Sequence, residues 1–231
     1  EMIAACLAGG VPLFVAYYRR ALPRFRKIKE LVDNKAVGEV RQVHIRLAQF
    51  SLALDPGSSQ KNLEALPWRV MPEIAGGGLF VDLACHTLDF LDYALGPVVE
   101  AKGIASNQLG LYPAEDMVNA VFQLASGAHM IGSWSFTTYE STEQAETDQV
   151  EIIGSQGKIT FSTFGTEPVR LETKAGTKTF DIPHPAHIQQ PLIQTIVDTI
   201  SYKGNLCPST GKSAARTSWV MDQILKDYYR G

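Results

Sequence analysis

The hydrophobic residues between Gly78 and Gly96 recur three or four positions apart. They are Phe80, Leu83, Ala84, Leu88, Leu91, Ala94 and Leu95. This spacing predicts an amphipathic helix with one apolar stripe facing a core. Three glycines, Gly76-Gly77-Gly78, precede the helix and one follows it, as expected for a loop that leads into a helix with a left-handed cap.

A polar stripe runs along the same predicted helix. Asp82, His86, Asp89 and Tyr93 are four, three and four positions apart, so they share one side of it. A carboxylate one turn before a histidine can fix the imidazole tautomer and raise its pKa, which suits a general acid/base. A hydrogen-bonded histidine at a helix surface is the alternative, and the D-x-x-x-H spacing alone does not distinguish the two.

Elsewhere, alternation with a period of two predicts strands. In residues 40–52, Val43, Ile45 and Leu47 face one way and their polar neighbours face the other. Further strands are expected at residues 100–106, 117–124, 129–138, 149–153, 158–162, 169–173 and 178–182. Helical patterns cover residues 1–7, 23–31, 192–200 and 212–229, with Ser209 or Thr210 as the cap of the last helix.

The apolar run Val11–Tyr18 is typical of a strand buried in a parallel sheet. A polar loop starting at Asp55 is long enough to be functional or mobile. Strands gathered in the middle of the chain, with helices at both ends, predict an α+β fold in which helices cover one face of a sheet.

Composition narrows the class of partner. The chain has 231 residues, 45% of them hydrophobic and 19% charged, with a formal net charge of -3. These values are typical of a globular protein and give no support for a nucleic-acid or anionic-membrane partner. There is neither a run of about 20 apolar residues nor a signal peptide, so we expect no membrane association. The local basic cluster is interpreted as a solvated helix face; its members are Arg19, Arg20, Arg24, Arg26, Lys27 and Lys29.

Cysteine and histidine spacing gives little sign of a metal or a disulfide. Cys6, Cys85 and Cys207 form no C-x-x-C pattern, which suits a reducing cytoplasm. His184 and His187 are close to a metal-ligand spacing, but Pro185 interrupts helical geometry between them and no third ligand is near. We therefore expect no metal site. The pair is interpreted as part of a surface loop before the helix at residues 192–200, and the alternative is that His187 borders a substrate cleft.

A longer pattern resembles a known family. The run Gly76-Gly77-Gly78, Asp82, His86 and Asp89 is similar to the G-G-G-x-x-x-D-x-x-x-H-x-x-D signature of the glucose-fructose oxidoreductase / inositol dehydrogenase (Gfo/Idh/MocA) family. The similarity extends to Pro67-Trp68-Arg69 and to Tyr17-Tyr18-Arg19-Arg20, although the family often has Asn in place of Tyr18. It covers nearly the whole chain, as the C-terminal part of such an enzyme.

The resemblance implies roles for several residues. Asp82 and His86 would serve the hydroxyl or carbonyl of a polyhydroxy substrate, with His86 as acid/base and Asp82 orienting it. Trp68 and Arg69 would border the cleft, where the arginine could hold substrate oxygens; a tryptophan that only anchors the loop is the alternative. The remaining assignments are Asp89 and His187 to the substrate, and Tyr18 and Arg19, at the end of a Rossmann strand, to the cofactor.

The resemblance also implies an open, mostly antiparallel sheet and a division of the chain. Residues 1–18 would be the remnant of a dinucleotide-binding domain, and residues 19–231 a substrate-binding and oligomerisation domain. The chain has no G-x-G-x-x-G, and the family's E-K-P lysine would lie upstream of Glu1. NAD or NADP is therefore expected in the full-length enzyme, whereas the fragment should neither bind it nor be active.

Two alternatives remain at this point. Relatives of the family use the same hydride step to cleave glycosides, and a non-catalytic binding or oligomerisation module could have the same fold. A homodimer or homotetramer formed through the sheet face is expected, because both sides of the strand at residues 129–138 have little charge.

Overall fold

The computed structural model describes residues 1–49, 66–137, 147–201 and 207–230. Its centre is an eight-stranded open sheet with the order β2-β3-β4-β1-β5-β6-β7-β8. The strands are β1 (Val40–Ala48), β2 (Val98–Ser106), β3 (Met117–Leu124), β4 (His129–Ser135), β5 (Thr147–Gly154), β6 (Gly157–Phe161), β7 (Val169–Thr173) and β8 (Gly176–Phe180). Only β1 and β4 pair in parallel; the other neighbouring strands are antiparallel. The α+β prediction is confirmed.

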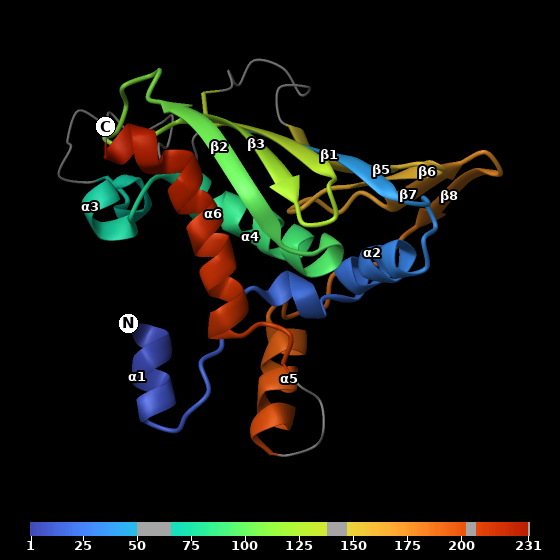
Figure 1. Ribbon diagram of the computed structural model, residues 1–231, viewed down its shortest axis with the longest axis horizontal. Helices are drawn as coiled ribbons and strands as arrows, with labels where there is room; N and C mark the ends of the chain where they lie inside the picture. Colours follow the sequence, from blue (N-terminus) through green and yellow to red (C-terminus); the bar gives the residue numbers. More distant parts are fainter. Residues whose placement is uncertain (50–65, 138–146, 202–206, 231) are drawn as a thin grey trace.

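Helices cover one face of this sheet (Figure 1). They are α2 (Pro23–Asp33), α4 (Leu79–Leu95) and α6 (Gly211–Tyr229). The core lies between them and the sheet, where Phe80 of α4 meets Trp134 of β4 edge to face with ring centroids 5.0 Å apart. Alternate residues of β3 are buried against this layer. The side chains that the alternation predicts to be buried therefore lie on the face that the helices cover.

The residues at the end of α4 and at the start of α6 are of the types that favour these helix boundaries. At Gly96, after α4, φ is 94°, a conformation that residues other than glycine rarely adopt. Helix α6 begins with a reciprocal capping box, in which Thr210 accepts from the backbone of Ser213 and Ser213 bonds back to Thr210. Of the two caps predicted, Thr210 is confirmed.

The smaller elements lie at the edges of this core. They are α1 (Met2–Ala8), α3 (Pro72–Ala75), α5 (Gln190–Ile200) and the 3-10 turns η1 (Tyr18–Ala21) and η3 (Trp68–Val70). Helices α1 and α5 extend away from the sheet (Figure 1). The stretch Pro72–Leu95 is long and apolar enough to span a membrane, but 61% of its most apolar window is buried inside the protein. That burial is what the core helix of a globular protein shows.

The strand predicted at Val11–Tyr18 is wrong. Phe14 makes one isolated bridge to Thr210, and residues from Tyr18 onward form η1. A strand requires neighbours for its backbone hydrogen bonds, and among the described residues no strand lies beside this segment. The polar loop predicted from Asp55 lies outside the described residues as far as residue 65, and its last part contains η3 and α3.

Only half of the basic cluster is a solvated face: Arg26 is exposed, and Lys27 and Lys29 pair with carboxylates at the helix surface. The other three members are buried. Arg19, Arg20 and Arg24 are only 2–3% exposed, and each guanidinium has acceptors from distant parts of the chain. Buried charges require such partners, and a sequence pattern cannot reveal partners that lie more than 60 positions away.

Candidate active site

A pocket of about 280 Å³ lies between the segment before η1, the segment from η3 to α3, and the first half of α4. It brings together four of the predicted site residues: Trp68, Arg69, Asp82 and His86. The rest of its lining is mainly apolar or small. This is the usual composition of a site in which a few polar groups orient a ligand.

The glycine run fixes where α4 begins. Gly76 has a φ of 79°, and a Cβ at Gly78 would lie 2.7 Å from Cβ of Ala114. The amide of Gly78 donates to Oε1 of Glu115 over 2.9 Å, and the hydroxyl of Tyr229 bonds the other carboxylate oxygen. Both glycines therefore allow a turn that a side chain would disrupt, and this turn sets the start of the helix that carries Asp82 and His86.

His86 lies in an aromatic environment. Its ring centroid is 5.9 Å from that of Tyr17, 5.3 Å from Tyr18 and 6.4 Å from Phe164. Burial, with a smaller contribution from the Arg19 charge, lowers the pKa of His86 to about 4. The sequence argument expected a raised pKa, and the structure gives the opposite direction. A neutral imidazole near pH 7 can accept a proton.

Asp82 does not orient His86 in this conformation. Its carboxylate lies 3.2 Å from Nε of Arg69, and Nδ1 of His86 is buried without a hydrogen-bond partner among the described residues. The Arg69 guanidinium also lies 4.6 Å from the Trp68 ring. Trp68, Arg69 and Asp82 thus form one polar wall of the pocket, and His86 forms another part of the lining.

Asp89 lies away from the pocket. Its carboxylate is fully buried and accepts two bonds from Arg20, of 2.7 Å to Nε and 2.6 Å to Nη2. Thr217 of α6 bonds the same group, and Asp92, one turn later, pairs with Arg216. The first half of the polar stripe, Asp82 and His86, therefore faces the pocket, whereas Asp89 and the neighbouring Asp92 join α4 to η1 and α6.

The other predicted residues also lie outside the pocket lining. Arg19 is buried and donates from Nε to the carbonyl of Thr163. Tyr18 packs against both His86 and Arg19, and His187 is exposed just before α5. Sequence reasoning missed Tyr17 as a lining residue; its position next to Tyr18 was the only signal, and it could not show which ring faces the pocket.

The chemistry available here is proton transfer and polar recognition. Burial raises the pKa of the Cys85 thiol to about 12, so this cysteine stays protonated and is a poor nucleophile. Within the described ranges, no three His, Cys, Asp or Glu side chains gather as metal ligands would. The pocket provides a neutral imidazole beside an arginine–carboxylate pair.

The low pKa of His86 predicts acid-sensitive stability. From about pH 6.5 down to about pH 4 the folded imidazole stays neutral, whereas the unfolded one binds a proton, so acid favours unfolding. The stabilisation is complete above pH 6.5 and is lost as the pH falls through this window. We expect the free energy of unfolding to fall by about 2 kcal/mol more between pH 7 and pH 5 in the natural chain than in His86→Asn. Urea denaturation at both pH values measures it, and equal losses in the two proteins would contradict it.

Comparison with known proteins identifies the family of the chain. Residues 25–160 match the GFO/IDH/MocA C-terminal domain. Oxidoreductase P35 of Formosa agariphila is 30% identical over 224 residues, which cover 96% of this chain and 64% of that protein. The D-xylose 1-dehydrogenase [NADP(+)] of Haloarcula marismortui is 26% identical over 162 residues, covering 69% of this chain and 41% of the relative.

Among solved structures, an inositol dehydrogenase homolog complexed with NAD+ from Azotobacter vinelandii superposes with a TM-score of 0.76 at 17% identity. It covers 97% of this chain, which in turn covers 65% of that structure. The relatives that match the chain are named as an oxidoreductase and a dehydrogenase. The chain belongs to the GFO/IDH/MocA family, and it spans less than two thirds of the length of these relatives.

Proposed function

We propose that the chain is the substrate-binding and catalytic part of an NAD(P)-dependent oxidoreductase that acts on a sugar, cyclitol or similar polyhydroxy compound. The observation that carries the proposal is the placement of a neutral His86 in one pocket with the Arg69–Asp82 pair. The relatives named above support the substrate class, because their names specify a sugar and a cyclitol.

Each group in the pocket has a role in this proposal. His86 takes the proton of the substrate hydroxyl during oxidation and returns it during reduction. The Arg69 guanidinium donates to substrate oxygens, and Asp82 holds that guanidinium in place. Trp68 offers its exposed ring as a surface for a sugar or cyclitol ring.

The pocket also suits the reactive end of a cofactor. Val15, Ala16 and Tyr17 form an apolar side that could hold a nicotinamide ring; when bound, that ring supplies or accepts a hydride. The phosphate-binding loop of such a cofactor has no counterpart in the sequence, so the remaining contacts must come from elsewhere in the parent protein. NAD and NADP are equally compatible with this pocket.

The experiment that tests the function uses the parent enzyme with NAD+ or NADP+ and a panel of aldoses, cyclitols and polyols. Absorbance at the nicotinamide band should rise with at least one substrate, while the present chain alone should show neither turnover nor cofactor binding by calorimetry. Release of an aglycone from an O-glycoside would favour the glycoside-cleaving alternative. No turnover of any kind would favour a non-catalytic binding module.

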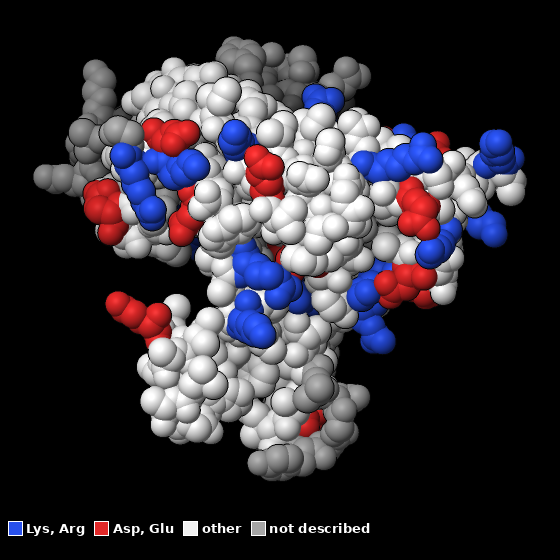
Figure 2. Space-filling view, in the orientation of Figure 1, with Lys and Arg blue, Asp and Glu red and all other residues white. Residues whose placement is uncertain are grey.

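We further propose that residues 1–18 belong to a dinucleotide-binding domain of the parent and residues 19–231 to the second domain. No residue of α1 is buried, and Met2 and Leu7 are about three-quarters exposed. On the face seen in Figure 2, α1 is white apart from an acidic group at its end. Such an apolar surface favours packing against further protein.

The three free thiols support a reducing, cytoplasmic setting.

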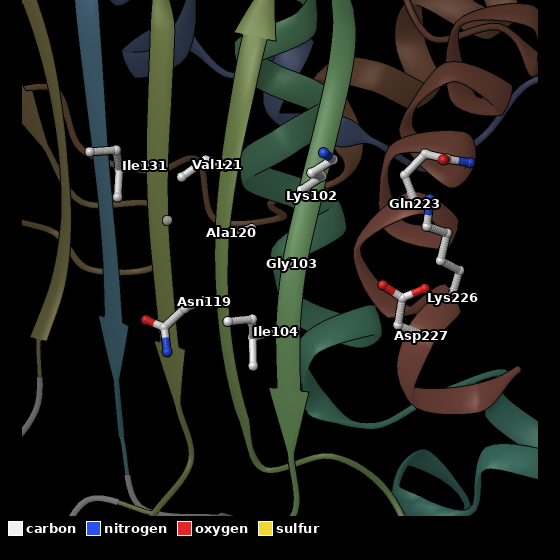
Figure 3. Close-up of a pocket in the computed structure, with 11 residues that line it drawn as sticks. Lys102, Gly103, Ile104, Asn119, Ala120, Val121, Ile131, Gln223, Lys226 and Asp227 are labelled. Atoms are coloured by element: carbon white, nitrogen blue, oxygen red, sulfur yellow. The ribbon is translucent and has the colours of Figure 1, made fainter. Parts of the chain in front are cut away.

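The uncovered face of the sheet supports association between copies of the chain. Ile104, Val121 and Ile131 are roughly 50–80% exposed there, and they line a shallow pocket of about 430 Å³ (Figure 3). Lys226 and Asp227 of α6 border it. A face with an apolar centre and charges of both signs at its rim can pair with a second copy of itself about a two-fold axis. We propose a homodimer, or a homotetramer that contains it.

This interface predicts the effect of a charge at its centre. Ile131→Glu should reduce the mass from that of an oligomer to the 25.3 kDa of the monomer, because two copies would then bury carboxylates without partners. Light scattering at micromolar concentration measures the mass. Ile193→Glu on α5 is the matched control, because Ile193 is similarly exposed but lies on another element. If the natural chain keeps the mass of a monomer when it is concentrated, the proposed interface is wrong.

A further inference from the structure

Three aromatic rings surround His86, and one arginine touches two of them. The guanidinium of Arg19 lies 4.9 Å from the Tyr18 ring centroid and 4.5 Å from that of Phe164. Both rings also contact the His86 imidazole. Arg19 is 2% exposed, so its planar group is buried against these two rings.

A short loop carries Phe164 to this position. Residues 162–165 follow β6, and three of their amides donate to the carboxylate of Asp148, over 2.9 Å from Thr163, 2.5 Å from Phe164 and 2.9 Å from Gly165. A carboxylate that accepts several backbone amides fixes a loop firmly.

Two buried arginines hold the same loop from the other side. Nε of Arg19 donates to the carbonyl of Thr163 over 3.1 Å, and Arg24 donates to the carbonyl of Gly165 and the hydroxyl of Ser162. Burying a guanidinium is costly, and Nη1 of Arg19 has no hydrogen-bond partner among the described residues. A turn that served only to connect two strands would not require this.

We propose that Arg19 is a positioning residue of the site, whose planar guanidinium holds the Tyr18 and Phe164 rings against the His86 imidazole. The catalytic importance of Arg19 rests on the proposed function, whereas the contacts that carry the assignment lie within this chain. It also replaces the cofactor contact expected of Arg19 from the sequence, because a side chain buried in this way faces the protein interior.

In this proposal, Arg19 acts by keeping water away from one side of the His86 imidazole. Tyr18 and Phe164 cover that side, which disfavours a charged ring. Other titratable groups lie near the site. Tyr17, Arg69, Asp82 and Cys85 line the pocket with His86, Tyr18 contacts the imidazole, Arg20 pairs with Asp89 on α4, and Asp148 holds the loop of Phe164. Asp82 and Asp89 are paired with Arg69 and Arg20 respectively. Arg19 contacts the Tyr18 and Phe164 rings, and its own charge also lowers the pKa of His86.

The test is an NMR titration of the histidines in this chain, which has five, with His86 assigned from His86→Asn. The natural chain should titrate His86 near pH 4 and show NOEs from its ring to Tyr18 and Phe164. Arg19→Met should raise that pKa by about one unit or more and abolish the NOEs, because the rings are released and a nearby positive charge is lost. Arg216→Met is the control: it removes an arginine that bonds Asp92 of α4, and it should change neither the His86 pKa nor the NOEs.

Arg19→Lys separates positioning from charge. Lysine keeps the positive charge but lacks the flat surface that packs between rings, so the NOEs should still be lost and the pKa should still rise. Restoration of both readouts by lysine would overturn the proposal, as would unchanged NOEs in Arg19→Met. If Arg19→Met does not fold, Phe164→Leu decides: an unchanged His86 titration in that folded variant also overturns it. None of these readouts depends on turnover, so failure of the proposed activity would be seen separately.

Discussion

Replacing His86 by Asn should lower kcat of the parent enzyme by about 100- to 10,000-fold, which is the usual contribution of a positioned acid/base. The reason is that His86 is the titratable group of the pocket whose neutral form can accept a proton near pH 7. Asparagine is close in size and polar, so the pocket should keep its shape. Steady-state kinetics with the substrate found in the panel measures the loss.

Two variants make this result specific. Asp82→Asn should cost less and act mainly on KM, because Asp82 contacts Arg69 rather than His86. His187→Asn should change neither constant, because His187 is exposed and outside the pocket lining. An unchanged kcat/KM in a folded His86→Asn enzyme would remove His86 from the mechanism.

Replacing Asp89 by Ala should destabilise the chain by about 3–5 kcal/mol, because it leaves the buried Arg20 charge without its main partner. Asp89 is fully buried and Arg20 is 3% exposed, so water cannot take the place of the lost carboxylate. The pair joins α4 to the segment before α2, and its loss should loosen the helix that carries the candidate acid/base. Urea denaturation at pH 7 measures the change.

A surface ion pair provides the control for this prediction. Glu39→Ala removes a carboxylate that pairs with Lys35 in solvent, and we expect no measurable change in the urea midpoint because exposed pairs contribute little. Asp89→Asn should fall between the two, since its amide oxygen can still accept from Arg20. A cost for Asp89→Ala no larger than that for Glu39→Ala would show that the buried pair does not hold α4 in place.

Local pattern was sufficient for most of the secondary structure. The strands at residues 117–124 and 169–173 begin and end where the alternation of polar and apolar side chains predicts, because that alternation records which face of each strand is buried. The helix from Leu79 to Leu95 follows from its glycine boundaries and its apolar spacing. Four residues that the sequence singled out, Trp68, Arg69, Asp82 and His86, line one pocket in the structure. Asp82 and His86 are one turn apart, and Trp68-Arg69 lie shortly before them in the chain.

Tertiary structure decided what those residues contact. The Val11–Tyr18 run has the composition of a strand but finds no strand to pair with among the described residues. Arg19 and Arg20 look like a basic surface in the sequence, yet their partners Thr163 and Asp89 lie 144 and 69 positions away. Asp82 pairs with Arg69 instead of His86, and the direction of the His86 pKa shift follows from rings that the fold places around it. The sequence by itself therefore determined most of the elements and the grouping of the candidate residues, because both depend on near neighbours. Pairing, burial and the charge state of His86 depend on groups distant in the chain, and only folding brings those groups together.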